Sequence, residues 1–208
     1  SREADAVLAR LEDAGHAAYA VGGCVRDLLR EAVPHDWDVT TSARPEEVMA
    51  LFPGRCIPTG LPHGTVTVRE NHQSIEVTTF RADGPYDDGR HPRSVTFSTR
   101  IEDDLARRDF TVNAMALDRR GTLVDVFGGR EDLARGVIRC VGEPDRRFGE
   151  DALRVMRALR FAACFGFSIG EETARSLRRS APGLRRIAAE RLREEMTKLL
   201  CGDGAAAV

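Results

Sequence analysis

Two aspartates two residues apart, Asp36 and Asp38, open a segment rich in β-forming residues. On a strand, side chains at positions i and i+2 point to the same face, with Cα atoms about 6.5–7 Å apart. Carboxylates placed this way can share divalent cations, above all Mg²⁺ with phosphate oxygens completing its shell. Glu76, inside a second expected strand, could add a third carboxylate. The pattern predicts a magnesium site, although Asp-x-Asp also occurs on ordinary surfaces.

His35 and Asp36 also form a His-Asp dipeptide, as in one class of phosphohydrolase. In that class the dyad lies on helices and has further His and Asp ligands. Here the dipeptide precedes an expected strand, so we exclude this reading.

A pair of glycines, Gly22 and Gly23, lies between an expected strand over 17–21 and an expected helix over 24–30. Glycine lets the backbone approach a ligand closely, and a helix N-terminus offers unpaired N–H groups with partial positive charge. Arg26, in the first turn of that helix, can add a charge-assisted contact to phosphate. The segment is neither a GxGxxG motif nor a Walker loop, and an ordinary tight turn is the alternative.

The run RRDFTVNA at 107–114 combines guanidinium groups, an acid and an amide. Arg108 is a planar multiple donor, and Asn113 can both donate and accept, so this run suits a triphosphate or a ribose. A helix end with a salt bridge is the alternative interpretation.

A helix is expected at 150–161, where apolar residues recur on one arc at about 100° per residue. Arg154 and Arg157 fall on the opposite side, and Arg160 lies at the flank. Asp151 neighbours Arg154 at the i, i+3 spacing. A solvated arginine face is the simpler interpretation of this helix taken alone.

The remaining patterns divide the chain into an α/β part at 1–142 and an all-α part at 143–208. Helices are also expected over 3–14 and 45–51 and in the acidic turn at 102–104, and strands over 37–41, 64–69, 74–80, 123–126 and 137–141. The polar, glycine-rich stretch 83–93 has turn chemistry. Beyond Gly142 strand patterns vanish, and glycines or Pro-Gly stop the helices near 166, 170 and 182.

Composition limits the classes of protein that the chain can belong to. Its 208 residues suit one or two domains with a buried core, and the net charge of −2 excludes a generally basic nucleic-acid coat. Residues 1–104 hold 11 arginines against 18 acids, whereas 105–208 hold 19 arginines and one lysine against 15 acids. This split indicates an acidic, metal-binding front and a phosphate-facing back, or else chance in an arginine-rich composition.

Five dispersed cysteines include no CxxC pair or zinc spacing, which is typical of reduced thiols. The chain has no apolar run of about 20 residues and no signal peptide, so we expect a cytoplasmic protein without membrane contact.

These segments together resemble the class II tRNA nucleotidyltransferase and poly(A) polymerase family of the DNA polymerase β superfamily. The matching segments follow in order along nearly the whole chain: GGCVRD, DWDVTT, HGTVTV, RRDFTVNA, DVFGGREDL and EDALRVMRALRF. The strand IEVTTFR and the stretch DGPYDDGRHP look like those of members that build the CCA end of tRNA. The segment HGTVTV stands where bacterial poly(A) polymerases differ.

The resemblance implies a nucleotidyltransferase head, with a mixed sheet and helices, followed by a helical neck. By position, Asp36 and Asp38 would hold two Mg²⁺ ions, and Glu76 would orient the attacking hydroxyl. The implied nucleotide-binding residues are Gly22, Gly23, Arg26, Arg108, Asn113, Asp151, Arg154, Arg157 and Arg160. Family members continue into body and tail domains, so we expect that the chain stops in the neck.

The implied activity is template-independent addition of CCA to the 3′ end of tRNA from CTP and ATP. A-only addition, CC addition and poly(A) synthesis are the alternatives within the same chemistry. A non-catalytic nucleotide- or RNA-binding module is the alternative of another class. No protein partner is implied.

Overall fold

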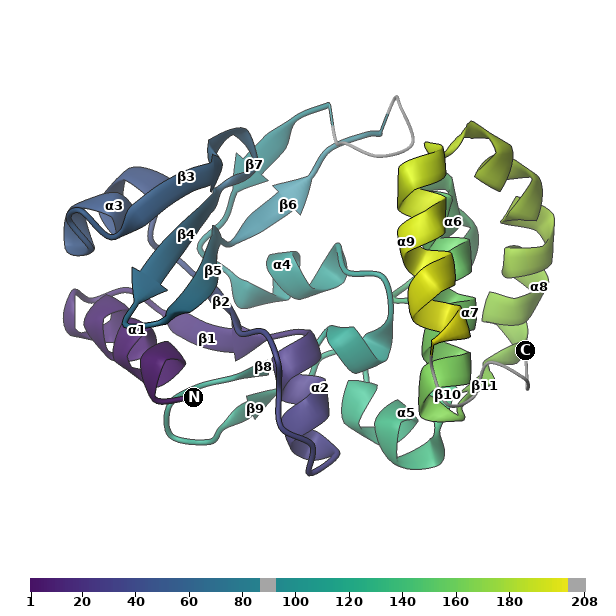
Figure 1. Ribbon diagram of the computed structural model, residues 1–208, viewed down its shortest axis with the longest axis horizontal. Helices are drawn as coiled ribbons and strands as arrows, with labels where there is room; N and C mark the ends of the chain where they lie inside the picture. The colour runs from purple at the N-terminus through teal and green to yellow at the C-terminus, as the bar shows by residue number, and fades with distance from the viewer. Residues whose placement is uncertain (87–92, 202–208) are drawn as a thin grey trace. The chain divides into compact units, whose positions relative to one another are not determined.

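The computed structural model describes residues 1–86 and 93–201 and forms two compact units (Figure 1). The first unit comprises Ser1–Gly84, Ser94–Arg108 and Asn113–Val126. The second takes the remainder, including Asp109–Val112 and the region from Phe127 onward.

A seven-stranded mixed sheet forms the centre of the first unit, in the order β3-β4-β5-β2-β1-β8-β9. Its strands are β1 (Ala18–Val21), β2 (Asp38–Thr41), β3 (Cys56–Gly60), β4 (Thr65–Glu70), β5 (Gln73–Thr79), β8 (Ala116–Leu117) and β9 (Leu123–Val124). The strands β2 and β5 run parallel, whereas the other neighbours in the described sheet are antiparallel.

Alternation along β2 and β5 decides which side chains enter the core and which are left for chemistry. Val39 lies opposite Val77 in the register, and both are 1 % exposed. Asp38 lies opposite Glu76. Because successive side chains of a strand point to opposite faces, this acidic pair occupies the face away from the two valines.

Helices of the first unit hold the sheet in place. The helix α1 (Arg2–Asp13) packs across β1, β2, β4 and β5 through Ala4, Val7, Leu8 and Leu11. The helix α3 (Pro45–Leu51) contacts α1 as well as β4 and β5, so both helices cover the same face (Figure 1). The helix α2 (Gly23–Leu29) follows β1 directly, and α4 (Ile101–Ala106) packs on β2 and on β6.

The first unit also contains smaller elements. They are the 3₁₀ turn η1 (Leu61–His63) and the hairpin of β6 (Arg81–Asp83) with β7 (Val95–Phe97). A further 3₁₀ turn, η2 (Thr111–Asn113), follows α4 at the point where the chain passes between the units.

The second unit is mostly helical and has an aromatic core. Its elements are α5 (Gly129–Arg135), β10 (Val137–Ile138), α6 (Pro144–Glu150), α7 (Leu153–Phe165), β11 (Ser168–Ile169), α8 (Glu171–Ser180), the 3₁₀ turn η3 (Ala181–Arg186) and α9 (Ala189–Leu200). Phe110 is fully buried and meets Phe161 of α7 edge to face, with ring centroids 5.9 Å apart. The helices α7 and α9 pack together, as do α6 and α8.

The structure confirms the expected mixed α/β head followed by a helical region. The expected helices over 3–14, 24–30 and 45–51 form within a residue of those limits, and the glycine stop at 166 is the C-cap of α7. The strands β3, β6, β7 and β8 were not predicted. In the described residues, no helix is long and apolar enough to cross a membrane.

One expectation about the second unit is wrong, because a strand does occur beyond residue 142. Strand β11 pairs in parallel with β10, joining Val137 to Ser168 and Ile138 to Ile169. Two residues are too few to show alternation, so the strand leaves no periodic signal. The last and longest stretch of the second unit begins at Phe127, so the expected boundary near 142 lies inside that unit.

Candidate active site

The carboxylates of Asp36, Asp38 and Glu76 form an acidic group on the first unit. Asp38 is the first residue of β2 and faces Glu76 of β5 across the parallel register, while Asp36 lies in the bend before β2. Burial raises the pKa of Asp38 from 3.8 to about 6, with Glu76 and Asp36 adding to the rise and Arg108 opposing it. Glu76, Asp36 and Arg108 are therefore near enough to Asp38 to act on its charge.

The chemistry of this acidic group is that of a Mg²⁺ site and differs from that of solvated surface carboxylates. All its donors are carboxylate oxygens, the ligand type that Mg²⁺ prefers, and Asp38 lacks a cation strong enough to offset its burial. In the described part of the chain, no three His, Cys, Asp or Glu side chains come together as a complete metal cage. That is expected of Mg²⁺, which takes one or two carboxylates and completes its shell with water and substrate phosphates.

Gly22 and Gly23, where β1 leads into α2, differ in whether the fold requires glycine there. Gly22 caps α2 with φ 78° and ψ −128°, and a Cβ there would lie 2.9 Å from Arg108 Nη1. Gly23 has no positive φ, and its Cβ would make only an ordinary contact, 3.6 Å from Arg26 Nη2. The fold therefore requires glycine at 22 but leaves glycine at 23 unexplained, as expected where a ligand approaches the backbone.

Arg26 and Asn113 are joined in a buried polar contact beside these glycines. Arg26 Nη1 donates to Asn113 Oδ1 at 2.7 Å, and Arg26 also pairs with Asp27 at 2.8 Å. Arg26 and Asn113 are both less than a tenth exposed. Burial holds these side chains in place, as a preformed phosphate site requires.

Asp104 is a residue that sequence reasoning treated only as part of an acidic helix turn. Its fully buried carboxylate accepts from Arg107 Nη2 at 2.6 Å and from Arg108 Nη2 at 2.9 Å. Burial by itself would raise the pKa of Asp104, but Arg108 and Arg107 hold it below its usual range. Arg108 Nε is buried without a hydrogen-bond partner among the described residues, a donor that a phosphate oxygen would satisfy.

In the second unit, Asp151 and Arg154 stand at the start of α7 with separate partners. Asp151 Oδ1 accepts from the backbone N–H of Leu153 at 3.0 Å, and Asp151 Oδ2 pairs with Arg191 at 2.7 Å. Arg154 Nη1 donates to Glu150 Oε2 at 2.6 Å. Each side chain is thus fixed in orientation by its own partners, and in the described part of the chain Asp151 and Arg154 do not form an ion pair with each other.

The other two arginines of α7 are held by buried acids. Arg157 pairs with Asp109 at 2.6 Å, and Arg160 Nε donates to Glu195 at 2.6 Å. Arg160 also lies over the ring of Phe161, 4.0 Å from its centroid. These arginines do not form a solvated face, because the side chains of Arg154 and Arg160 are only 12 % and 14 % exposed, and that of Arg157, 33 % exposed, is ion-paired with Asp109.

Residues 18–139 match the poly A polymerase head domain. The chain belongs to this family. Residues 166–208 also match a second domain, described as a probable RNA and SrmB-binding site of polymerase A.

Named relatives of this head domain are CCA-adding enzymes. The chain is 50 % identical to the CCA-adding enzyme of Geobacillus stearothermophilus over 205 residues, which is 99 % of the chain and 50 % of that protein. It is 51 % identical to that of Lactobacillus helveticus over 94 % of the chain and 49 % of that protein. The chain thus spans about half the length of these curated relatives.

Solved structures agree with this family assignment. The crystal structure of the Bacillus stearothermophilus CCA-adding enzyme in complex with CTP superposes with a TM-score of 0.91 and 48 % identity, covering 99 % of this chain and 50 % of that one. The Thermotoga maritima CCA-adding enzyme complexed with tRNA superposes with a TM-score of 0.78 and 30 % identity, covering 97 % and 47 %.

The expected site residues fall into two groups, one in each unit. Asp36 and Asp38 lie at the start of β2, with Glu76 opposite Asp38 on β5, and Arg108 acts on the charge of Asp38 and lies beside Gly22. Four of the expected nucleotide-binding residues lie together on the second unit around α7: Asp151, Arg154, Arg157 and Arg160. The stretch DGPYDDGRHP, expected as the loop of CCA-adding members, lies partly outside the described residues.

The sequence did not reveal the partners of these side chains: the acids Asp104, Glu150, Asp109 and Glu195, which hold arginines, and Arg191, which holds Asp151. Arginine patterns were visible, but an acid gives no signal of which arginine it will meet. Two of these pairs, Asp104 with Arg108 and Glu150 with Arg154, have the i, i+4 spacing of neighbours on a helix, so the sequence could have indicated them.

Replacement of the cap glycine of the head domain, Gly22→Ala, is expected to destabilise the fold by about 2 kcal/mol and lower the melting temperature by about 5 °C. An L residue is strained at φ 78°, and the new Cβ would displace Arg108. Gly23→Ala is the matched control, because its Cβ meets only ordinary contacts, and it should melt within about 1 °C of the parent. Equal melting temperatures of the two variants, measured by circular dichroism, would contradict this account.

Proposed function

We propose that the protein adds C and A nucleotides to the 3′ end of tRNA without a template, using CTP and ATP. The observation that carries the proposal is the acidic group of Asp38, Glu76 and Asp36 beside Arg108, which has both halves of a nucleotidyl-transfer site, metal ligands and a phosphate-facing cation. The names of the relatives, CCA-adding enzymes at about 50 % identity, support the choice of product.

Asp36 and Asp38 are the residues that would hold two Mg²⁺ ions. Bound Mg²⁺ supplies charge neutralisation at the reacting phosphate and favours ionisation of the attacking hydroxyl. Glu76, on the same face as Asp38, would orient the terminal 3′-hydroxyl of the RNA.

The basic side chains of the first unit would position the triphosphate. Arg108, held by Asp104, has a buried Nε without a partner among the described residues, and it faces Gly22. Arg26 and Asn113 add a second pair of fixed polar groups, and the bare backbone at Gly23 lets the phosphates approach. In the reaction, the 3′-oxygen bonds to the α-phosphorus, the α–β anhydride bond breaks, pyrophosphate leaves, and the hydroxyl proton passes to solvent.

Asp151 and Arg154 would choose the base. Cytosine and adenine each present an amino donor next to a ring-nitrogen acceptor, whereas uracil and guanine present the reverse. A carboxylate can accept from the amino group and a guanidinium can donate to the ring nitrogen, so UTP and GTP would leave buried groups unpaired. Arg157 and Arg160, fixed by Asp109 and Glu195, would support this helix and the triphosphate.

The domain roles follow from this assignment. Residues 1–142 would be the catalytic head, in keeping with the head-domain match at 18–139, and residues 143–208 the neck that carries base recognition. A cytoplasmic location is supported by five cysteines that are all free thiols.

The product profile tests the proposal. The protein is incubated with Mg²⁺, a tRNA lacking its CCA end, and one labelled nucleotide at a time or CTP and ATP together. We expect two C residues and one A, with less than about 1 % incorporation from UTP or GTP. Addition of A alone onto tRNA ending in CC would make it an A-adding enzyme, and long A tails a poly(A) polymerase. Addition that stops after CC would make it a CC-adding enzyme, and nucleotide binding without incorporation would favour a non-catalytic module.

A further inference from the structure

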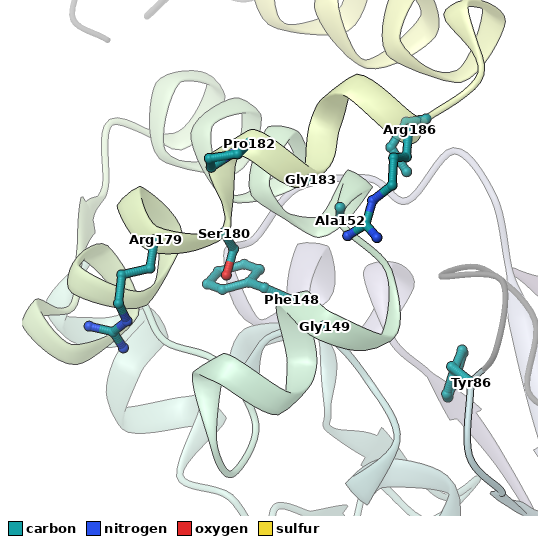
Figure 2. Close-up of a pocket in the computed structure, with 10 residues that line it drawn as sticks. Tyr86, Phe148, Gly149, Ala152, Arg179, Ser180, Pro182, Gly183 and Arg186 are labelled. Carbon is teal, nitrogen blue, oxygen red and sulfur yellow. The ribbon is translucent and has the colours of Figure 1, made fainter.

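A pocket of about 630 Å³ opens in the second unit among residues that have no role in the proposed nucleotidyl transfer. It lies between the end of α6, at Phe148 and Gly149, the N-cap of α7 at Ala152, and the segment from Ser180 to Ile187 (Figure 2). Its size is within the range of pockets that hold small ligands or single nucleotides.

The described lining of this pocket is cationic, with one of its two arginines, Arg179, paired to Asp145 outside the lining. Residues 173–189 carry five arginines and no acid. Two of these, Arg179 and Arg186, line the pocket, and its described lining contains no Asp or Glu. Figure 2 shows them on opposite sides, with Ser180 and Phe148 between them and the Arg186 guanidinium turned toward Ala152. A pocket with cations on two sides selects an anion, and more than one anionic group fits.

The two arginines differ in how they are held. Arg179 Nη2 spans both oxygens of Asp145, at 2.7 and 2.8 Å, which fixes the side chain at the edge of the pocket. Arg186 is exposed and has no ion pair or hydrogen bond with any residue that the structure describes. An unpaired guanidinium at the mouth of a cavity is the group most available to a phosphate.

The backbone of the pocket is shaped for close approach. Gly183 brings η3 against the N-cap of α7, since a Cβ there would lie 3.1 Å from the Cβ of Ala152. At Gly149 a Cβ would meet nothing within 4 Å, so the missing side chain leaves open space. Phe148, 1 % exposed, closes the apolar floor. The pocket is thus an open space with an apolar floor and polar edges.

We propose that this pocket binds one nucleotide of an RNA strand, with its flanking phosphates on Arg186 and Arg179 and its sugar over Ser180. Nucleotides combine the two features required here, an apolar body and negative charges on both sides. The match of residues 166–208 to a probable RNA-binding domain agrees with RNA as the occupant. The proposal deepens the proposed function by adding an RNA contact separate from Asp151 and Arg154, and it rests on that function for the identity of the RNA.

The test measures binding, not turnover. The affinity for a fluorescently labelled tRNA transcript lacking its CCA end is measured by anisotropy over a series of KCl concentrations. For Arg186→Gln we expect about 3- to 10-fold weaker binding and a salt slope smaller by about 0.7, as for one lost phosphate contact. Arg193→Gln is the matched control, since Arg193 is also exposed and lies outside the pocket, and it should stay within about 2-fold of the parent.

A second variant guards against a purely electrostatic effect. Gly149→Leu keeps the charge and fills the open space, and we expect it to weaken tRNA binding by about 3-fold or more. Melting temperature and CTP affinity are measured for every variant, and Arg186→Gln should leave both unchanged. Binding of tRNA within 2-fold of the parent for Arg186→Gln, or an equal loss for Arg193→Gln, would overturn the proposal. Absence of C and A incorporation with the Arg186 effect retained would instead refute only the proposed function.

Discussion

Replacement of Asp38 by asparagine should reduce nucleotide incorporation by at least about 1000-fold, because it removes a carboxylate from the acidic group that would hold Mg²⁺. Asparagine keeps the shape of the side chain and its place opposite Glu76 at the start of β2. The loss therefore reports the charge and not the packing. Labelled CTP with tRNA lacking its CCA end provides the measurement.

The same variant should be more stable than the parent when Mg²⁺ is absent. The pKa of Asp38 rises on folding from 3.8 to about 6, so the folded state holds this proton more tightly than the unfolded state. Below pH 4 both states are protonated and the group costs nothing. As the pH rises through 6, the parent loses about 1–3 kcal/mol, allowing for solvent screening, and Asp38→Asn escapes that loss.

Chelator-treated samples melted at pH 4, 6 and 7.5 would check the sign, with Asp13→Asn as the control on an exposed aspartate of α1. Added Mg²⁺ should stabilise the parent at pH 7.5 and leave Asp38→Asn unchanged. If Asp38→Asn were no more stable than the parent without metal, the carboxylates would not be crowded, and the metal assignment would lose its physical basis.

The candidate site residues could be predicted from the sequence, because each belongs to a pattern of residues close together in the chain. The i, i+2 aspartates lie where a strand begins, the paired glycines lie between β1 and α2, and the arginines of α7 recur on one helix. Each of these signals depends on residues fewer than about ten apart, within one element or one turn. Long strands with clean alternation, such as β4 and β5, were predictable for the same reason.

What could not be predicted was set by contacts across the fold. Asp151 meets Arg191, and Arg157 meets Asp109, over separations of 40 and 48 residues. The two-residue strand β11 was not predicted, because it exists only by pairing with β10, which lies within the strand expected over 137–141. No local period encodes such partners, so the sequence suggested Asp151 and Arg154 as nucleotide-binding residues without showing the side chains that fix each of them.

The largest effect on the fold is expected from Asp104→Asn, which leaves two arginines without their shared acid. Asp104 is fully buried, and Arg107 and Arg108 both donate to it. Removing one partner from a buried ion pair costs about 3–5 kcal/mol, since the remaining charge stays desolvated. We expect a melting temperature lower by about 10 °C and weaker CTP binding, because Arg108 would no longer be held beside Gly22.

The pH dependence gives this prediction a sign. Although burial would raise the pKa of Asp104, Arg108 and Arg107 lower it below its ordinary value of 3.8. The stabilisation is therefore complete at neutral pH and declines only as the pH falls below 3.8 through the folded-state pKa. The stability difference between parent and Asp104→Asn should be constant from pH 5 to 8 and shrink in acid.

Glu102→Gln supplies the control, because Glu102 lies on the same helix turn but its side chain is 44 % exposed, and its ion pair with the exposed Arg100 is long, at 3.5 Å. It should change the free energy of unfolding by less than about 0.5 kcal/mol. If Asp104→Asn unfolded no more easily than Glu102→Gln, the two arginines would have another source of compensation. Arg108 would then owe its position to Gly22 and the sheet, and the weaker CTP binding expected of Asp104→Asn would also disappear.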